Sequence, residues 1–295
     1  MPLRFAHTSD IHLLDLQGVA PWRYLNKRLT GRLNLALRRS KKHDSSLFDH
    51  ATRKAVEVGA ERLVITGDLT NLALEPEFAL VRSKLDALPV PSTVIPGNHD
   101  TYTRGSVAAA RCETFLGHHM EGEREGEHRY PFVQRFEGVA LIGLSTGIAT
   151  RPFRAVGRLG PGQLSRLATV LATLRAEGRA RVILIHHPVL PGESGPHKEL
   201  LDLEEFGAVV AQHGAELVLH GHEHRRIDGA LPGPEGEAVV HGIASGTALS
   251  QSPKYRASFS LYDADASSIR RTIYQWNGTE FTCNETSEQT VAWAA

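Results

Sequence analysis

Most of the residues that could do chemistry in this 295-residue chain fall into five short groups that are far apart in the sequence. Each group follows a short apolar run of the kind that forms a buried strand. The groups are Asp10-Ile11-His12, Gly67-Asp68, Gly97-Asn98-His99-Asp100, His186 and Gly221-His222-Glu223-His224. Since open α/β sheets bind ligands at the carboxyl ends of their strands, the five groups are expected to meet in one place.

The side chains of these groups are carboxylates, an amide and imidazoles, all of which are hard or borderline metal ligands. Two divalent ions about 3.5–4 Å apart need a bridging group, and a carboxylate suits that role. Imidazole and carboxylate together fit Mn, Fe or Zn better than Ca. Such a pair of ions activates water and clamps phosphoryl oxygens, and a further histidine can protonate the leaving oxygen. The residue types therefore predict a dinuclear centre that hydrolyses phosphoesters.

Taken singly, each group also has an ordinary structural interpretation. Asp10 and Asp68 are typical of turns or helix caps, and Asn98 beside Gly97 is typical of a turn. Their joint occurrence at five strand ends favours the metal site over these separate interpretations.

The elements that must position the groups alternate between strands and helices. Strands are expected at residues 3–8, 62–66, 92–95, 130–136, 139–145, 181–185, 216–219, 238–244, 257–262 and 269–275. Helices are expected at residues 46–59, 76–88, 162–177 and 200–213. The pattern predicts a single α/β domain over residues 1–295, with two sheets packed face to face and helices outside. The polar tail at 277–295 carries no clear pattern.

The ordered groups resemble the calcineurin-like metallophosphoesterase superfamily, whose pattern reads Asp-x-His, Gly-Asp, Gly-Asn-His-Asp/Glu, His and Gly-His-x-His. The match spans residues 10–224. The resemblance implies a four-layer α/β/β/α sandwich of two packed mixed sheets with flanking helices. It also implies two divalent metal ions, Mn, Fe or Zn, as cofactors.

The resemblance further implies a role for each residue. The first metal would be held by Asp10, His12 and His224, the second by Asn98, His186 and His222, and both by the bridging Asp68. His99 would contact the scissile phosphate, and Asp100 would orient His99 through a hydrogen bond.

The substrate class is less sharply indicated. The compact length and the run Gly67-Asp68-Leu69-Thr70-Asn71 look like the bacterial cyclic-nucleotide phosphodiesterases, so a small phosphodiester is the expected substrate. Lipid-pathway pyrophosphatases usually carry Phe-Glu where Thr70-Asn71 stands, and nucleases of the family have a longer region after the last histidine group, which disfavours nucleic acid. A membrane-surface pyrophosphatase acting on a nucleotide-linked lipid is one alternative. A non-catalytic scaffold is another, although no ligand is missing here.

The remaining histidines divide by their surroundings. His197 lies in a loop at 191–198 that should overhang the site, so it is a candidate substrate contact. His187 is either a substrate contact or structural, and His7 and His220 are expected to be core imidazoles. The other histidines are interpreted as surface or structural residues: His43, His50, His118, His119, His128, His213 and His241.

Residues 16–43 contain no acidic side chain, and they predict a basic helical cap at about 20–44. Its cations run from Arg23 to Lys42: Arg23, Lys27, Arg28, Arg32, Arg38, Arg39, Lys41 and Lys42. Apolar residues recur at steps of three and four along one helical face: Trp22, Leu25, Leu29, Leu33 and Leu37. Either this is an ordinary helix with a solvated basic face, or it binds an anionic membrane or substrate.

The overall composition adds few constraints. Lys plus Arg and Asp plus Glu both total 33, so any preference for an anionic partner must be local. Two distant cysteines make no disulfide framework, and no apolar run is long enough to cross a membrane. We therefore expect a cytoplasmic protein, with the basic segment able to bring it to the inner face of the membrane. The last strands offer an edge for a homodimer.

Overall fold

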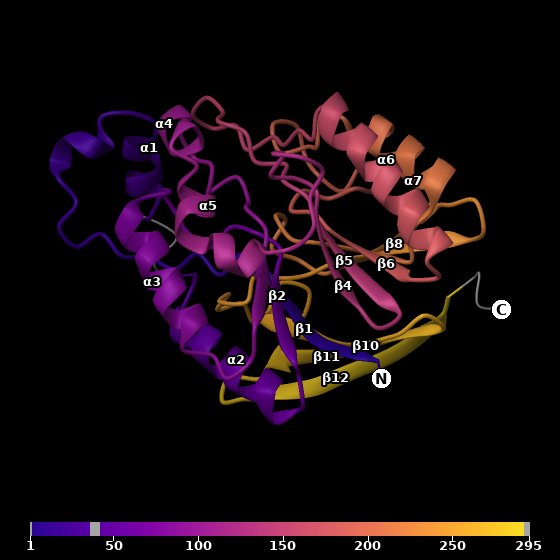
Figure 1. Cartoon of the computed structure of the whole chain (residues 1–295). Coiled ribbons are helices and arrows are strands. Elements are labelled where there is room, and N and C mark those ends of the chain that lie inside the picture. The colour runs from indigo at the N-terminus through magenta and orange to yellow at the C-terminus, as the bar shows by residue number, and fades with distance from the viewer. Residues whose placement is uncertain (1, 36–41, 292–295) are drawn as a thin grey trace.

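The computed structural model describes residues 2–35 and 42–291, and two six-stranded mixed sheets form its centre (Figure 1). The first sheet contains, in spatial order, β12 (Phe281–Thr290), β11 (Ser268–Trp276), β10 (Ser258–Ala264), β1 (Leu3–Thr8), β2 (Arg62–Ile65) and β3 (Ser92–Val94). The second contains β4 (Phe132–Phe136), β5 (Val139–Gly143), β6 (Ala180–Leu184), β7 (Leu217–His220), β9 (Glu237–Gly242) and β8 (Ile227–Pro232).

The strands that precede the chemical groups pair in parallel with their neighbours. In the first sheet β1, β2 and β3 are parallel, whereas β10, β11 and β12 continue the sheet in antiparallel pairs. In the second sheet β5, β6, β7 and β9 are parallel, and antiparallel β4 and β8 form the two edges. Parallel pairing aligns the carboxyl ends of the strands, so the loops after β1, β2 and β3 leave from one edge, as do those after β6 and β7.

Alternation along each strand divides the second sheet between two apolar layers. Val139 and Leu141 of β5 belong to the core between the sheets, together with Phe5 and Phe259 of the first sheet. Ala140 and Ile142 face the other way, into a second core. Because successive side chains of a strand point to opposite faces, a fully apolar strand such as β5 must be covered on both sides.

Helices supply the outer layers (Figure 1). The second core is completed by Leu167 and Leu171 of α6 (Pro161–Ala176) and Phe206 of α7 (Leu203–His213). The first sheet is covered by α2 (Ser46–Glu57) and α3 (Glu75–Asp86). The structure thus confirms the expected sandwich of two mixed sheets with flanking helices.

Several elements were not predicted from the sequence. They are β8 and β12, the short helices α4 (Arg104–Ala108) and α5 (Arg111–Leu116), and the 3-10 turn η3 (Gly117–Met120). β12 is exposed along most of its length, so its polar sequence shows no apolar alternation. β8 contains Gly229 and Pro232, residues that are uncommon inside strands and mark an edge.

The basic segment is divided and not one continuous helix. It forms a 3-10 turn, η1 (Pro21–Tyr24), and the helix α1 (Lys27–Asn34). Asn26 caps the start of α1, because its side chain accepts the N–H of Arg28. Its expected residues Leu37, Arg38, Arg39 and Lys41 lie outside the described residues. In the described part of the chain no helix has the length and apolarity needed to cross a membrane.

Candidate metal centre

The loops after the five strands hydrogen-bond one another beyond the ends of the sheets. The N–H of Asp10 donates to the carbonyl oxygen of Gly67 at 3.0 Å, and that of His12 to the carbonyl of Asp68 at 3.0 Å. The second sheet joins them where the N–H of His222 donates to Oδ2 of Asp10 at 2.9 Å. The five groups therefore meet at one edge, as the strand ends predicted.

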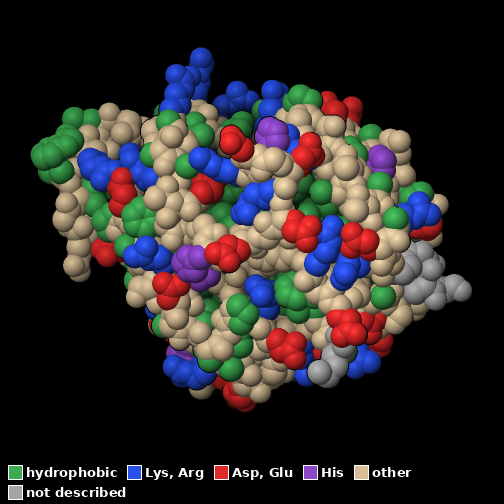
Figure 2. Space-filling view, in the orientation of Figure 1, with side chains coloured by type: hydrophobic (Ala, Val, Ile, Leu, Met, Phe, Trp, Pro, Cys, Tyr) green, Lys and Arg blue, Asp and Glu red, His purple; other side chains and the backbone are tan. Residues whose placement is uncertain are grey.

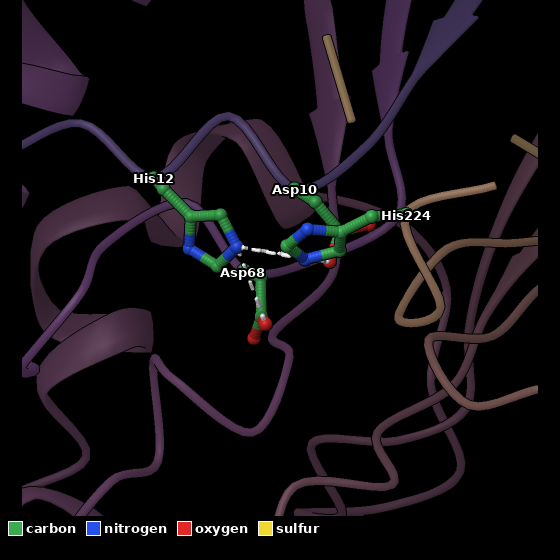
Figure 3. Close-up of side chains that lie close together, drawn as sticks. All are labelled: Asp10, His12, Asp68 and His224. Atoms are coloured by element: carbon green, nitrogen blue, oxygen red, sulfur yellow. Dashed lines mark hydrogen bonds and ion pairs between the residues drawn. The ribbon is translucent and has the colours of Figure 1, made fainter. Parts of the chain in front are cut away.

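Asp10, His12, Asp68 and His224 form the first ligand cluster, with one ligand atom from each within 4.8 Å of all the others (Figure 3). Nε2 of His224 lies 3.1 Å from Oδ1 of Asp10 and 3.1 Å from Nε2 of His12. Nε2 of His12 lies 3.8 Å from Oδ2 of Asp68. These are the residues expected at the first metal, together with the expected bridge.

Asp68, His186 and His222 form the second cluster, so Asp68 belongs to both. Nε2 of His186 lies 3.4 Å from Oδ1 of Asp68 and 3.1 Å from Oδ1 of Asn98. Nδ1 of His222 lies 3.3 Å from Nε2 of His186. The structure thus brings together all seven residues predicted as ligands, with Asp68 between the two sets.

Backbone carbonyls orient three of the imidazoles. Nδ1 of His186 lies 2.7 Å from the carbonyl oxygen of Thr66, and Nδ1 of His12 lies 3.2 Å from that of Thr70. The ring of His222 has the opposite orientation, because its Nε2, and not its Nδ1, faces a carbonyl, that of Lys198 at 3.0 Å. A ring nitrogen beside a carbonyl carries the hydrogen, so the opposite nitrogen of each ring turns its lone pair toward the centre.

Hydrogen-bond acceptors, carboxylate oxygens and ring nitrogens, consequently face one another in the buried centre. Burial alone would raise the pKa of Asp68, but the charges of His186, His99 and His12 hold it well below its usual range. Burial alone would lower the pKa of His186, but the charge of Asp68 outweighs it and raises the pKa to about 9, so a metal ion that binds this ring must displace a proton from Nε2. Burial and the nearby His187 hold the pKa of His222 well below its usual range, which keeps it in the neutral form that binds metals. Facing lone pairs and carboxylates call for cations, so the residues fit two metal ions.

His99 stands beside the ligands in a fixed orientation. The backbone N–H of His99 donates to Oδ1 of Asp68 at 2.7 Å, and the ring Nδ1 of His99 lies 2.7 Å from the carbonyl oxygen of Asn71. The ring of Tyr102 stacks on that of His99 with centroids 5.3 Å apart. Tyr102 was not singled out from the sequence, and Asn71 was noted only for the substrate class, since a packing ring and a backbone carbonyl leave no motif.

Asp100 occupies a different position from the expected one. Its Oδ1 accepts from the N–H and hydroxyl of Thr70, and its Oδ2 accepts from the N–H groups of Leu69 and Gly97. Burial and the charge of Asp68 raise its pKa to about 6. These contacts fasten the loop after β2 to the loop after β3, while Asn71 supplies the carbonyl beside Nδ1 of His99. Asp100 therefore positions the loops of the site, in place of the expected hydrogen bond to the His99 ring.

The backbone around the ligands is strained. Five of the seven predicted ligands have positive φ angles: Asp10 (54°), His12 (46°), Asp68 (52°), His222 (73°) and His224 (51°). Residues other than glycine rarely adopt this region, and such strain collects at functional sites. Two glycines of the motifs let the backbone pass close to the ligands. A Cβ on Gly97 would collide with Oδ1 of Asp68, and one on Gly221 with the side chains of Ser9 and Asp10.

A cavity of about 830 Å³ opens over the ligands. Its lining includes Asp68, His99, Lys198, Tyr255 and His43. His43 was expected to be a surface or structural residue, but its ring centroid lies 5.5 Å from those of His12 and His224. Backbone pairing of residues 42–44 with 247–249 brings it there, and no motif signals such a contact.

The loop at 191–198 reaches this cavity through Lys198 and not through His197. The side chain of His197 is exposed, and its carbonyl accepts the N–H of Ala155. His187 is structural, because its Nδ1 pairs with the hydroxyl of Thr146 at 2.7 Å and its Nε2 with the carbonyl of Ala155 at 3.0 Å. Within this loop Lys198 is therefore the better placed side chain for substrate.

Residues 3–226 match the family model described as calcineurin-like phosphoesterase. The chain therefore belongs to the calcineurin-like phosphoesterase family, as the order of its motifs predicted, and it is a metallophosphoesterase. Enzymes of this family use two divalent metal ions, and the two ligand clusters are where this chain would hold them.

Two bacterial relatives narrow the comparison. A probable cyclic nucleotide phosphodiesterase of Rhodopseudomonas palustris is 26% identical over 176 residues, which cover 58% of this chain and 59% of that protein. Another probable cyclic nucleotide phosphodiesterase, from Synechococcus sp., is 26% identical over 228 residues, covering 76% of this chain and 74% of that protein. The chain thus spans less than two thirds of the Rhodopseudomonas relative.

Solved structures share the fold at low sequence identity. A dimetal phosphatase from Danio rerio superposes with a TM-score of 0.62 and 14% identity, over 98% of this chain and 99% of that one. A purple acid phosphatase from yellow lupin gives a TM-score of 0.62 and 12% identity, over 98% of this chain and 54% of that one.

The substitution Gly97→Ala should damage the metal centre, because the added methyl must displace the carboxylate of Asp68. We expect metal affinity to fall by about 10–100-fold, as for loss of a supporting contact. Metal titration followed by a chromogenic phosphoester assay measures both effects. In Gly105→Ala the nearest atom to the new Cβ is 3.9 Å away, so this control should behave as the parent. Equal affinities in the two variants would contradict the packing argument.

Proposed function

We propose that this chain hydrolyses a small phosphodiester, with a cyclic nucleotide as the leading substrate. The observation that supports this most directly is the cavity of about 830 Å³ directly over the ligand clusters. Binding pockets of about 300–1,000 Å³ suit ligands of drug or nucleotide size. The names of the two bacterial relatives point to the same substrate class.

The lining of the cavity offers groups for each part of such a substrate. When bound, two divalent ions supply a nucleophilic water and neutralise phosphoryl charge. His99, held between Tyr102 and the carbonyl of Asn71, is placed to contact the phosphoryl group and the leaving oxygen. Lys42 and Lys198 line the mouth and attract an anion, while Tyr255 and Gln251 offer an aromatic face and an amide to a planar base.

Hydrolysis of bis-p-nitrophenyl phosphate and of p-nitrophenyl phosphate provides the first test. With EDTA neither compound should be hydrolysed, because the centre depends on metal. Added Mn²⁺ should restore turnover, with the diester preferred, and 3′,5′-cyclic AMP would then be assayed directly. A preference for the monoester, or turnover that persists in EDTA, would contradict the proposal.

Variants of two neighbouring residues separate coordination from catalysis. Asp68→Asn should lose bound metal and nearly all turnover, because the amide cannot supply the bridging charge. His99→Ala should keep its metal and lose about 10²–10⁴-fold in kcat, the usual contribution of a proton-transferring group. Metal content and kcat are measured on the same preparations. Loss of metal from His99→Ala would move His99 into the ligand set.

A second proposal concerns the basic segment, which we infer docks on an anionic membrane. Its apolar residues on η1, on α1 and between them face solvent, since Trp22 is 71% exposed, Leu25 77%, Leu29 56% and Leu33 60%. Figure 2 shows apolar side chains at the left margin of the molecule, where Figure 1 places the segment before α2. Exposed apolar stripes with a tryptophan at one end are typical of helices that lie in a membrane interface.

The described cations of this segment make contacts with the protein. Arg28 is buried and donates to the carbonyl oxygens of Leu72 and Ala73, and Arg23 pairs with Glu75 at 2.6 Å. These contacts disfavour the first of the two interpretations of the segment, an ordinary helix with a solvated basic face. The absence of acidic residues from 16 to 43 still makes the segment compatible with anionic lipid.

The segment also lies close to the catalytic histidine. Nζ of Lys27 lies 4.5 Å from the centre of the Tyr102 ring, and Tyr102 stacks on His99. Docking would thus bring the cavity toward the lipid surface. This supports the alternative substrate, a nucleotide-linked lipid pyrophosphate, without a change in the metal centre.

Membrane docking is tested with the double variant Leu25→Glu/Leu29→Glu. Vesicles of phosphatidylcholine and phosphatidylglycerol should sediment the parent, and the variant should bind at least about tenfold more weakly, since each leucine loses its apolar burial. The control Phe153→Glu/Leu201→Glu adds the same charge at exposed apolar sites elsewhere and should sediment like the parent. Failure of the parent to sediment, or equal sedimentation of all three, would refute docking.

A further inference from the structure

A second group of metal-ligating side chains lies outside the catalytic centre. It consists of Asp86, at the end of α3, with His118 and His119 of η3, whose ligand atoms all lie within 4.8 Å of one another. Nε2 of His118 lies 2.7 Å from Oδ1 of Asp86, and Nε2 of His119 lies 3.2 Å from the same oxygen. Two imidazoles thus converge on one carboxylate oxygen.

His119 gives this group the features of a built site. Its side chain is more than nine-tenths buried, and its Nδ1 is held by the hydroxyl of Ser92 at 2.7 Å. Its Nε2 is buried and lies 3.2 Å from Oδ1 of Asp86, a contact that lacks hydrogen-bond geometry, and it makes no hydrogen bond within the described residues. A hydrogen bond on the far nitrogen that fixes the ring is the usual support of a metal-bound histidine.

This cluster is separate from the catalytic pair of clusters. Ser92 begins β3, whereas Asn98 follows its carboxyl end. At about 3.3 Å per residue, six residues place the two sites up to about 20 Å apart, at opposite ends of the strand. Neither site shares a ligand with the other.

We propose that Asp86, His118 and His119 bind one borderline divalent ion of the zinc class. Two imidazoles and a carboxylate form a three-ligand set common for Zn²⁺, and they also suit Co²⁺ and Ni²⁺. The side chain of His118 is half exposed, so the remaining coordination positions are open to water. The ion joins the end of α3 to η3 and, through Ser92, to β3, and so it stabilises the fold without taking part in hydrolysis.

Zinc titration of the Mn²⁺-loaded protein tests the proposal in competition with a chromophoric chelator. The parent should bind one Zn²⁺ per chain more than His118→Ala or Asp86→Asn, and excess Zn²⁺ should raise its Tm by about 5 °C more than theirs. His118 and Asp86 are both partly exposed, so these variants should fold. Exposed His128 provides a matched control, and His128→Ala should match the parent in both measurements.

Hydrolysis of bis-p-nitrophenyl phosphate by His118→Ala should equal that of the parent, which distinguishes this site from the catalytic one. Equal zinc stoichiometry and equal Tm response in the parent, His118→Ala and Asp86→Asn would overturn the proposal. A stoichiometric loss shared by His128→Ala would do so as well, because it would indicate non-specific binding to surface histidines.

Discussion

The structure depends on the burial of two carboxylates, Asp10 and Asp68, between the ends of two sheets. A buried charge is tolerated only when it is paired and hydrogen-bonded. Here the compensation comes from the opposite sheet: His186, which follows β6 and is anchored to the carbonyl of Thr66, faces Asp68, and the N–H of His222, which follows β7, donates to Asp10. The same groups that make burial tolerable therefore define the metal centre and hold the two halves of the sandwich in register.

Much of this arrangement could be predicted from the sequence. Apolar runs that stop at Asp, Asn or His predicted where the strands end. Parallel pairing of these strands then places the seven ligands at the same edge. Contacts made by backbone atoms were not predictable, because any residue type provides them. Asn71 acts through its carbonyl, and His43 reaches the cavity through pairing between distant segments. Polar β12 lacks the alternation from which strands are inferred.

The basic segment shows a different limit of sequence patterns. Periodicity predicted one helical face for Trp22, Leu25, Leu29 and Leu33, but only Leu29 and Leu33 lie in α1. All four are exposed, and a period cannot say whether such residues turn toward the protein or away from it. Two cations of the segment turn toward the protein instead: Arg28 donates to a buried carbonyl oxygen, and Arg23 pairs with Glu75. Long charged side chains can pack and hydrogen-bond inside a protein when acceptors are available.

The left-handed backbone at five metal ligands has an evolutionary consequence. Each such residue costs of order 1 kcal/mol or more, and only bound metal and the surrounding loops repay that cost. If His222 or His224 mutated to glycine, the chain would lose catalysis but relax its backbone. A descendant that abandons hydrolysis is no longer required to hold a side chain in this strained backbone, so a constraint on its sequence is lifted at the positions that the metal centre occupies.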